Sequence, residues 1–177
     1  MLAKALSEFD IDAIYSSDLQ RAYDTAKIVA KERRIAVKKE PGIKERCYGA
    51  WEGLHFDRIR KEFPSIYKIW MDRPQRAKIP RAEALKALQK RAISAVNKIL
   101  ARHKGKTVLV VAHGGTNRTI LFNYLGIPLD NFWRVKQDNC CTNIVSFNKE
   151  TGKPKLLLMN FTPLAGKKLG GSTSGTY

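Results

Sequence analysis

The stretch VLVVAHGG, at residues 108–115, decides the fold class of this 177-residue chain. Its uninterrupted apolar and mostly β-branched run predicts a strand buried on both faces, as in a parallel sheet. An apolar helical pattern to Leu125 follows directly, so His113 stands between the end of a buried strand and the start of a helix. A strand that feeds a helix in this way indicates an α/β fold, with a mostly parallel sheet between helices in three layers.

The position of His113 also predicts a binding site. Ligands of open α/β sheets bind at the carboxyl ends of the strands, and the first N–H groups of a helix have no partner inside the helix. We therefore interpret His113 and Gly114 as candidates for binding an anion such as phosphate. The pattern leaves one alternative open, which is a structural histidine held by a hydrogen bond.

A second strand, turn and helix lie near the N-terminus. Residues 11–15 favour a strand, and Ser17 with Gln20 has the spacing of a capping box for a helix that runs to about Glu32. Arg21 lies about one turn into this helix, where its guanidinium could hold a phosphate by two parallel hydrogen bonds. An arginine exposed on a helix surface is the commoner case, so this motif alone is weak.

The segment ERCYGAWEG, at residues 45–53, is typical of a site loop because it combines charged and aromatic side chains with two glycines. An acid here, such as Glu45, could protonate a leaving oxygen if burial or a neighbouring anion kept it protonated. The alternative is an exposed loop with a docked tryptophan.

The rest of the chain predicts one domain over residues 1–165 and a flexible tail over residues 166–177, which is rich in Gly, Ser and Thr. The first residues resemble the last turns of a helix. Further expected elements are a strand at 37–40, short helices at 56–63 and 66–71, a long helix from Leu85 to about Ile99, and strands at 144–147 and 156–159.

Composition narrows the class of partner. Lys and Arg outnumber Asp and Glu by 33 to 16, so the protein attracts anions, but the basic residues are scattered and indicate a solvated basic face. We expect no nucleic-acid partner and no membrane partner. The three cysteines lack metal-ligand spacing and no signal pattern opens the chain, which favours a cytoplasmic protein that needs no metal or cofactor.

Together the segments around residues 16–22, 45–53 and 108–115 resemble, in order and spacing, the histidine phosphatase superfamily, which includes phosphoglycerate mutases. The resemblance implies a phosphoglycerate-mutase-like fold and hydrolysis of phosphomonoesters of small metabolites through a phosphohistidine. It implies that Arg21 clamps phosphate, that His113 holds the phosphoryl oxygens, that Glu45 is the general acid, and that Arg46 and Tyr48 lie near the substrate.

Two features depart from the family pattern. Family members begin with a strand that ends in Arg-His-Gly, whose histidine attacks phosphorus, and this sequence contains no such tripeptide. We expect that strand to be missing from the centre of the sheet, between the strands near Ile14 and Val110, through truncation or because another chain fills the place as a homodimer or swapped oligomer. In addition, Arg81 stands where the family has a small residue before Glu83.

The sequence therefore leaves the activity open. The first interpretation is a phosphatase domain that is truncated and inactive as it stands. Phosphoglycerate mutase is an alternative, although the spacing of about 27 residues between Gly53 and Pro80 favours the compact phosphatases. A non-catalytic protein that binds phosphate or polyanions is the other alternative, motivated by the net charge of +17.

Overall fold

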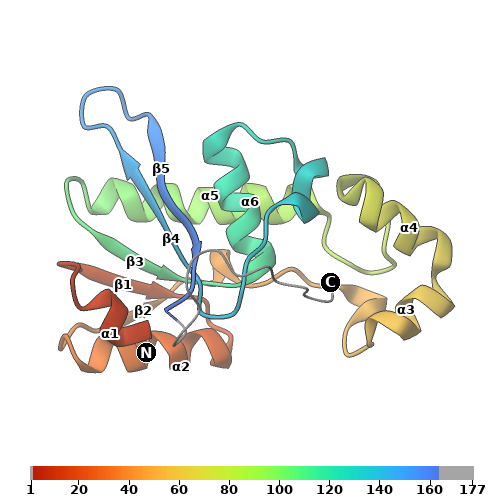
Figure 1. Ribbon diagram of the computed structural model, residues 1–177, viewed down its shortest axis with the longest axis horizontal. Helices are drawn as coiled ribbons and strands as arrows, with labels where there is room; N and C mark the ends of the chain where they lie inside the picture. The colour runs from red at the N-terminus through yellow and green to blue at the C-terminus, as the bar shows by residue number, and fades with distance from the viewer. Residues whose placement is uncertain (1, 164–177) are drawn as a thin grey trace.

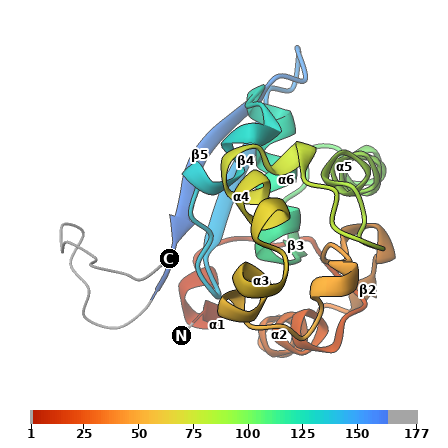
Figure 2. The same cartoon turned by 90° about the vertical axis from the view of Figure 1, so that its right-hand side faces the viewer.

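The computed structural model describes residues 2–163, and its centre is a three-stranded parallel sheet with the strand order β2-β1-β3. Strand β1 (Ala13–Ser16) is fully buried between β2 (Val37–Lys39) and β3 (Val108–Val111). A separate antiparallel hairpin is formed by β4 (Thr142–Phe147) and β5 (Pro154–Phe161). Figures 1 and 2 place this hairpin on the side of β3 that faces away from β1.

Helices cover both faces of the parallel sheet (Figure 1). Helices α1 (Leu2–Leu6) and α2 (Gln20–Lys31) lie on one face, and α5 (Leu85–Arg102) and α6 (Gly114–Leu125) lie on the other. Successive side chains of a strand point to opposite faces. Ile14 therefore packs against α2, whereas its neighbours Ala13 and Tyr15 pack against Ile99 of α5.

A helical layer beside the sheet holds the largest apolar cluster. It comprises α3 (Phe56–Glu62), α4 (Pro64–Asp72) and the 3₁₀ turns η2 (Gly49–Trp51), η3 (Pro74–Arg76) and η4 (Leu129–Arg134). The turn η1 (Pro41–Ile43) packs against α5 instead, through Ile43. Trp70 and Phe132 are almost completely buried at the centre of the layer, together with Phe122 of α6. Figure 2 shows α3 and α4 in front of the sheet.

The expectation that a strand is missing between β1 and β3 is wrong. β1 and β3 pair directly, from Ala13 with Val108 to Ser16 with Val111, so no strand is absent between them. Within residues 2–163, the open edges are those of β2 and β3 in the parallel sheet and those of β4 and β5 in the hairpin, and β3 is open on its side away from β1. The run at 108–111 is consequently half-buried and not fully buried, because β3 is an edge strand here.

The prediction of a capping box at Ser17 is also wrong. Helix α2 begins at Gln20 with Leu19 at its N-cap, and no side chain caps it. The Ser17 hydroxyl accepts a hydrogen bond from the Leu19 N–H in the turn before the helix, and Gln20 pairs with Asp24 one turn on. The other expected helices and strands agree with the structure to within a few residues, and residues 166–177, the expected tail, lie outside the described part of the chain.

Arg81 adopts a left-handed backbone with φ of +58°. Side chains with a Cβ are strained there, which explains why a small residue is expected at this position. The segment around Arg81 also packs against backbone: a Cβ on Gly49 would lie 2.3 Å from the Pro80 carbonyl oxygen. The loop at 79–83 thus packs closely against the loop at 45–53 and supports it.

We predict that Arg81→Gly raises the free energy of unfolding by about 1 kcal/mol, because glycine adopts this backbone without steric strain. Urea denaturation of both proteins measures the change. Arg81→Ala is the matched control, since it removes the same charge and keeps the Cβ. An equal gain from Arg81→Ala would assign the effect to charge and contradict the prediction.

Candidate functional site

His113 lies at the carboxyl end of β3, where the pairing of β1 with β3 brings Ser17 beside it. The strands stay paired up to Ser16 and Val111, and the Ser17 N–H donates to the Val111 carbonyl at 2.9 Å. The His113 Nε2 atom is then 2.9 Å from the Ser17 hydroxyl, and both side chains are buried. The strand geometry therefore orients the imidazole at the N-cap of α6.

Burial lowers the pKa of His113 below its ordinary value of 6.5. The charges around it act in both directions: Glu45 and Asp18 raise this pKa, whereas Arg21 and Arg91 lower it. The net direction is downward, so the ligand-free site holds a neutral imidazole at pH 7. A neutral ring has one N–H donor and one acceptor nitrogen.

The N-terminus of α6 holds the Glu45 carboxylate. Its Oε2 accepts from the Gly115 N–H at 3.1 Å, and its Oε1 accepts from the Thr116 N–H and hydroxyl, both at 3.2 Å. A helix N-terminus stabilises negative charge through these N–H groups. Two of the N–H groups that we expected to face a phosphate therefore bind an acid of the protein itself.

Gly115 provides the space for this contact. A Cβ on Gly115 would lie 2.7 Å from Glu45 Oε1, a separation that requires one group to move. A Cβ on Gly114 would meet nothing nearer than Gln137 at 3.8 Å. Gly114 was the predicted anion-binding glycine, but Gly115 is the glycine whose missing side chain admits the carboxylate.

Arg91 of α5 holds the backbone that carries Glu45. Its Nη1 donates to the carbonyls of Gly42 and Lys44 at 2.9 and 2.8 Å, and its Nη2 donates to the Glu45 carbonyl at 3.2 Å. Its Nε and Nη2 also make a bidentate ion pair with Glu83 at 2.6 and 2.8 Å. Arg91 could not be identified from the sequence, because a lone arginine on a helix belongs to no motif.

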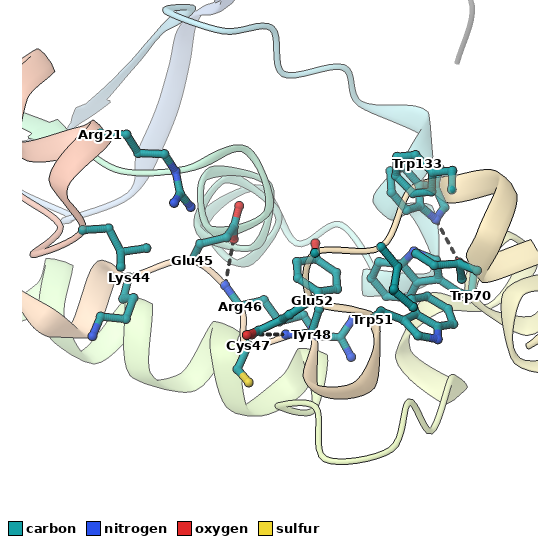
Figure 3. Close-up of a pocket in the computed structure, with 15 residues that line it drawn as sticks. Arg21, Lys44, Glu45, Arg46, Cys47, Tyr48, Trp51, Glu52, Trp70 and Trp133 are labelled. Atoms are coloured by element: carbon teal, nitrogen blue, oxygen red, sulfur yellow. Dashed lines mark hydrogen bonds between the residues drawn. The ribbon is translucent and has the colours of Figure 1, made fainter. Parts of the chain in front are cut away.

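A cavity of about 610 Å³ extends from this site, and Figure 3 shows the side chains around it. Arg21, Glu45, Arg46 and Tyr48 are among its lining residues, so the structure brings these four predicted residues to one cavity. His113 and Gly114 are not part of the lining. His113 is near enough to Glu45 and Arg21 for their charges to shift its pKa.

Arg46 and Tyr48 are part of the packed wall of the cavity. The Arg46 guanidinium stacks over Trp70 at 4.6 Å and over Tyr48 at 5.3 Å, and its Nε donates to the Glu83 carbonyl at 2.7 Å. Burial lowers the pKa of Arg46 and raises that of Tyr48 to about 12. At neutral pH Tyr48 is therefore an uncharged phenol.

Residues 2–163 contain no group of three or more His, Cys, Asp or Glu side chains arranged to hold a metal ion. None of the helices in this part of the chain is long and apolar enough to cross a membrane.

Comparisons with known proteins agree with this geometry. A family model described as "Histidine phosphatase superfamily (branch 1)" matches residues 1–162. Phosphoserine phosphatase 1 of Hydrogenobacter thermophilus is 30% identical over 162 residues, which cover 92% of this chain and 76% of the relative. Adenosylcobalamin/alpha-ribazole phosphatase of Escherichia coli is 25% identical over 82% of this chain and 72% of its own length.

Solved structures show the same fold. Bacillus stearothermophilus YhfR superposes with a TM-score of 0.83 at 31% identity, covering 89% of this chain and 77% of that one. The mycobacterial glucosyl-3-phosphoglycerate phosphatase Rv2419c has a TM-score of 0.81 at 24% identity, over 90% of this chain and 82% of its own. At that identity the second likeness concerns the fold alone.

We predict that Gly115→Ala lowers the free energy of unfolding by about 1–3 kcal/mol, because the new methyl group displaces the Glu45 carboxylate. Gly114→Ala, one residue earlier in the same helical turn, is the matched control and should cost little. Urea denaturation measures both. In a Glu45→Ala background the cost of Gly115→Ala should disappear; an unchanged cost would mean that Glu45 is not the group displaced.

A second prediction concerns the titration of His113. Its imidazole should titrate below pH 6.5, as followed by NMR of the histidine side chains and assigned with His113→Gln. Because the unfolded chain takes up this proton more readily, the corresponding stability is present above pH 6.5 and is lost as pH falls through the folded-state pKa. A midpoint at or above 6.5 in the phosphate-free protein would refute the burial argument.

Proposed function

This chain belongs to the histidine phosphatase superfamily, and we propose that it is a phosphomonoester hydrolase domain that acts on small phosphorylated metabolites. The observation that carries the proposal is the convergence of Arg21, Glu45 and the aromatic wall on one cavity beside His113. The names of the relatives support it, since they include phosphoserine and alpha-ribazole phosphatases.

In this proposal Arg21 and His113 bind the phosphate. Arg21 is exposed at the edge of the cavity, so its guanidinium is accessible to an anion and offers paired N–H donors. His113 lies near enough to Arg21 to feel its charge, and a bound phosphate dianion would stabilise the protonated form of the imidazole. Gly114, the first residue of α6, would add its backbone N–H to the phosphate site.

Glu45 serves as the proton donor in the proposed reaction. Glu45 lines the same cavity as Arg21, the proposed phosphate ligand. The acid then gives its proton to the leaving oxygen, a step that contributes about 10²–10⁴-fold in comparable enzymes. Arg46 and Tyr48 form the adjoining wall and contact the organic part of the substrate.

The chain by itself supplies one histidine to this site. His55 is 80% exposed at the N-cap of α3, where it contacts Asp57. His103 ends α5 at the amino end of β3, where its ring contacts the Tyr15 hydroxyl at 3.1 Å. A phosphohistidine route needs a second histidine in line with the leaving group, so we propose that the 177-residue chain alone is inactive.

The unpaired edges of β3 and β4 are the place where a further strand would complete the sheet. Open edges of this kind pair with strands of other chains. We propose that a second molecule, as a homodimer or a swapped oligomer, or another segment of a longer protein, pairs there. A cytoplasmic location is part of the same proposal, supported by three free cysteines.

A non-catalytic phosphate- or polyanion-binding protein is the second candidate, favoured by the net charge of +17 and the single histidine at the site. Such a protein would retain nucleic acid in a salt-sensitive way. Specific phosphate binding at Arg21 would separate the enzyme-type site from general attraction to anions.

We predict that the chain alone hydrolyses p-nitrophenyl phosphate no faster than buffer, yet binds vanadate or phosphate. Arg21→Ala should weaken that binding at least about tenfold, since a charged bidentate contact is lost. Lys31→Ala, a change of equal charge on the same helix, is the control. Calorimetric titration and a phosphatase assay of one preparation measure both quantities.

Two outcomes would contradict this proposal. Turnover that depends on His113 would mean that the chain has a nucleophile other than a second histidine. Equal losses of affinity in Arg21→Ala and Lys31→Ala would mean that Arg21 forms no phosphate site.

A further inference from the structure

All three tryptophans of the chain line the cavity beside Arg21 and Glu45. Trp51 and Trp70 form its depth, and Trp133 closes one side; Figure 3 shows them grouped at the end remote from Arg21. The cavity volume of about 610 Å³ suits a small organic molecule. Phosphate binding at Arg21 does not require an aromatic wall. The wall therefore indicates the chemical nature of the rest of the ligand.

The aromatic wall is rigid before any ligand binds. Trp70 makes edge contacts with Trp133 at 5.3 Å and with Trp51 at 6.5 Å, and it packs against Phe132 at 5.4 Å. The Trp133 indole N–H donates to the Trp70 carbonyl at 2.8 Å, which fixes the ring. A preformed apolar surface binds a ring with little loss of side-chain freedom.

Some polar groups of the wall are hydrogen-bonded within the protein. The Glu52 carboxylate accepts from the Tyr48 N–H at 3.0 Å, and the Arg46 Nε donates to the Glu83 carbonyl. The Arg46 Nη1 atom has no partner among the described residues, but it is enclosed by protein. Beyond the phosphate site, the aromatic wall offers mainly ring faces, together with the buried indole N–H of Trp51, which has no partner among the described residues.

Phe56 supplies an independent observation. It is the first residue of α3, lines the same cavity and is 56% exposed, so its ring is accessible to a ligand. Leu54, two residues earlier, continues the apolar surface. Phe56 and Leu54 thus extend the apolar surface of the aromatic wall.

We propose that the substrate is an aryl or similarly flat apolar phosphomonoester, whose phosphate binds at Arg21 and whose ring packs against Tyr48, Phe56 and Trp133. This inference rests on the proposed function and names the substrate class for that site. It separates this chain from the relatives named for phosphoserine, whose substrate carries two charged groups besides the phosphate.

The test compares phenyl phosphate, O-phosphoserine and inorganic phosphate by calorimetric titration of the whole chain, with the tryptophan indole N–H signals followed by NMR. Phenyl phosphate should bind at least about tenfold more tightly than the other two and should shift the indole signals, because only it buries apolar area. Phe56→Ser should reduce that preference several-fold and leave inorganic phosphate unaffected. Phe9→Ser, which changes an exposed phenylalanine outside the cavity, is the matched control.

The outcomes separate the two proposals. Equal affinity for phenyl phosphate and O-phosphoserine, with binding that depends on Arg21, would overturn the substrate class and leave the phosphatase function standing. If no phosphate compound binds, or if Arg21→Ala has no effect, the proposed function fails as well. Phe56→Ser is preferred to Trp133→Ala because Phe56 is exposed, so its replacement changes the aromatic wall without disturbing the core.

Discussion

The hydrogen bonds of one guanidinium group, that of Arg91, hold the site together. It binds the carbonyls of Gly42, Lys44 and Glu45 and the carboxylate of Glu83, so that α5, the loop at 79–83 and the loop at 45–53 keep one arrangement. A planar group with five donors suits this task, whereas a lysine offers a single point charge. Loss of this side chain would leave several partly buried carbonyl groups unpaired.

The position of Glu45 then follows from two constraints. Arg91 holds its backbone, and the start of α6 holds its carboxylate. His113 is the residue from which α6 begins, so the acid and the imidazole share one helix end and interact electrostatically. The aromatic wall continues from the same loop, because Tyr48 and Trp51 lie three and six residues beyond Glu45.

Local patterns in the sequence predicted the elements and most of the candidate residues. The strand before His113, the helix after it and the loop at Glu45 are each visible within about ten residues. The roles of Ser17, Arg91 and Gly115 were not predicted, because they depend on partners 96, 46 and 70 residues away in the chain. Strand order is equally non-local, which explains why the unpaired edge was expected on the wrong side of β3.

The contact between Ser17 and His113 spans 96 residues and has a kinetic consequence. Closing a loop of that length costs entropy before any contact repays it, and parallel strands of high sequence separation pair slowly. The candidate site therefore forms only when β1 and β3 have paired. A partly folded molecule, however much helix it contains, has no assembled site, so ligand binding would report that these two strands have paired.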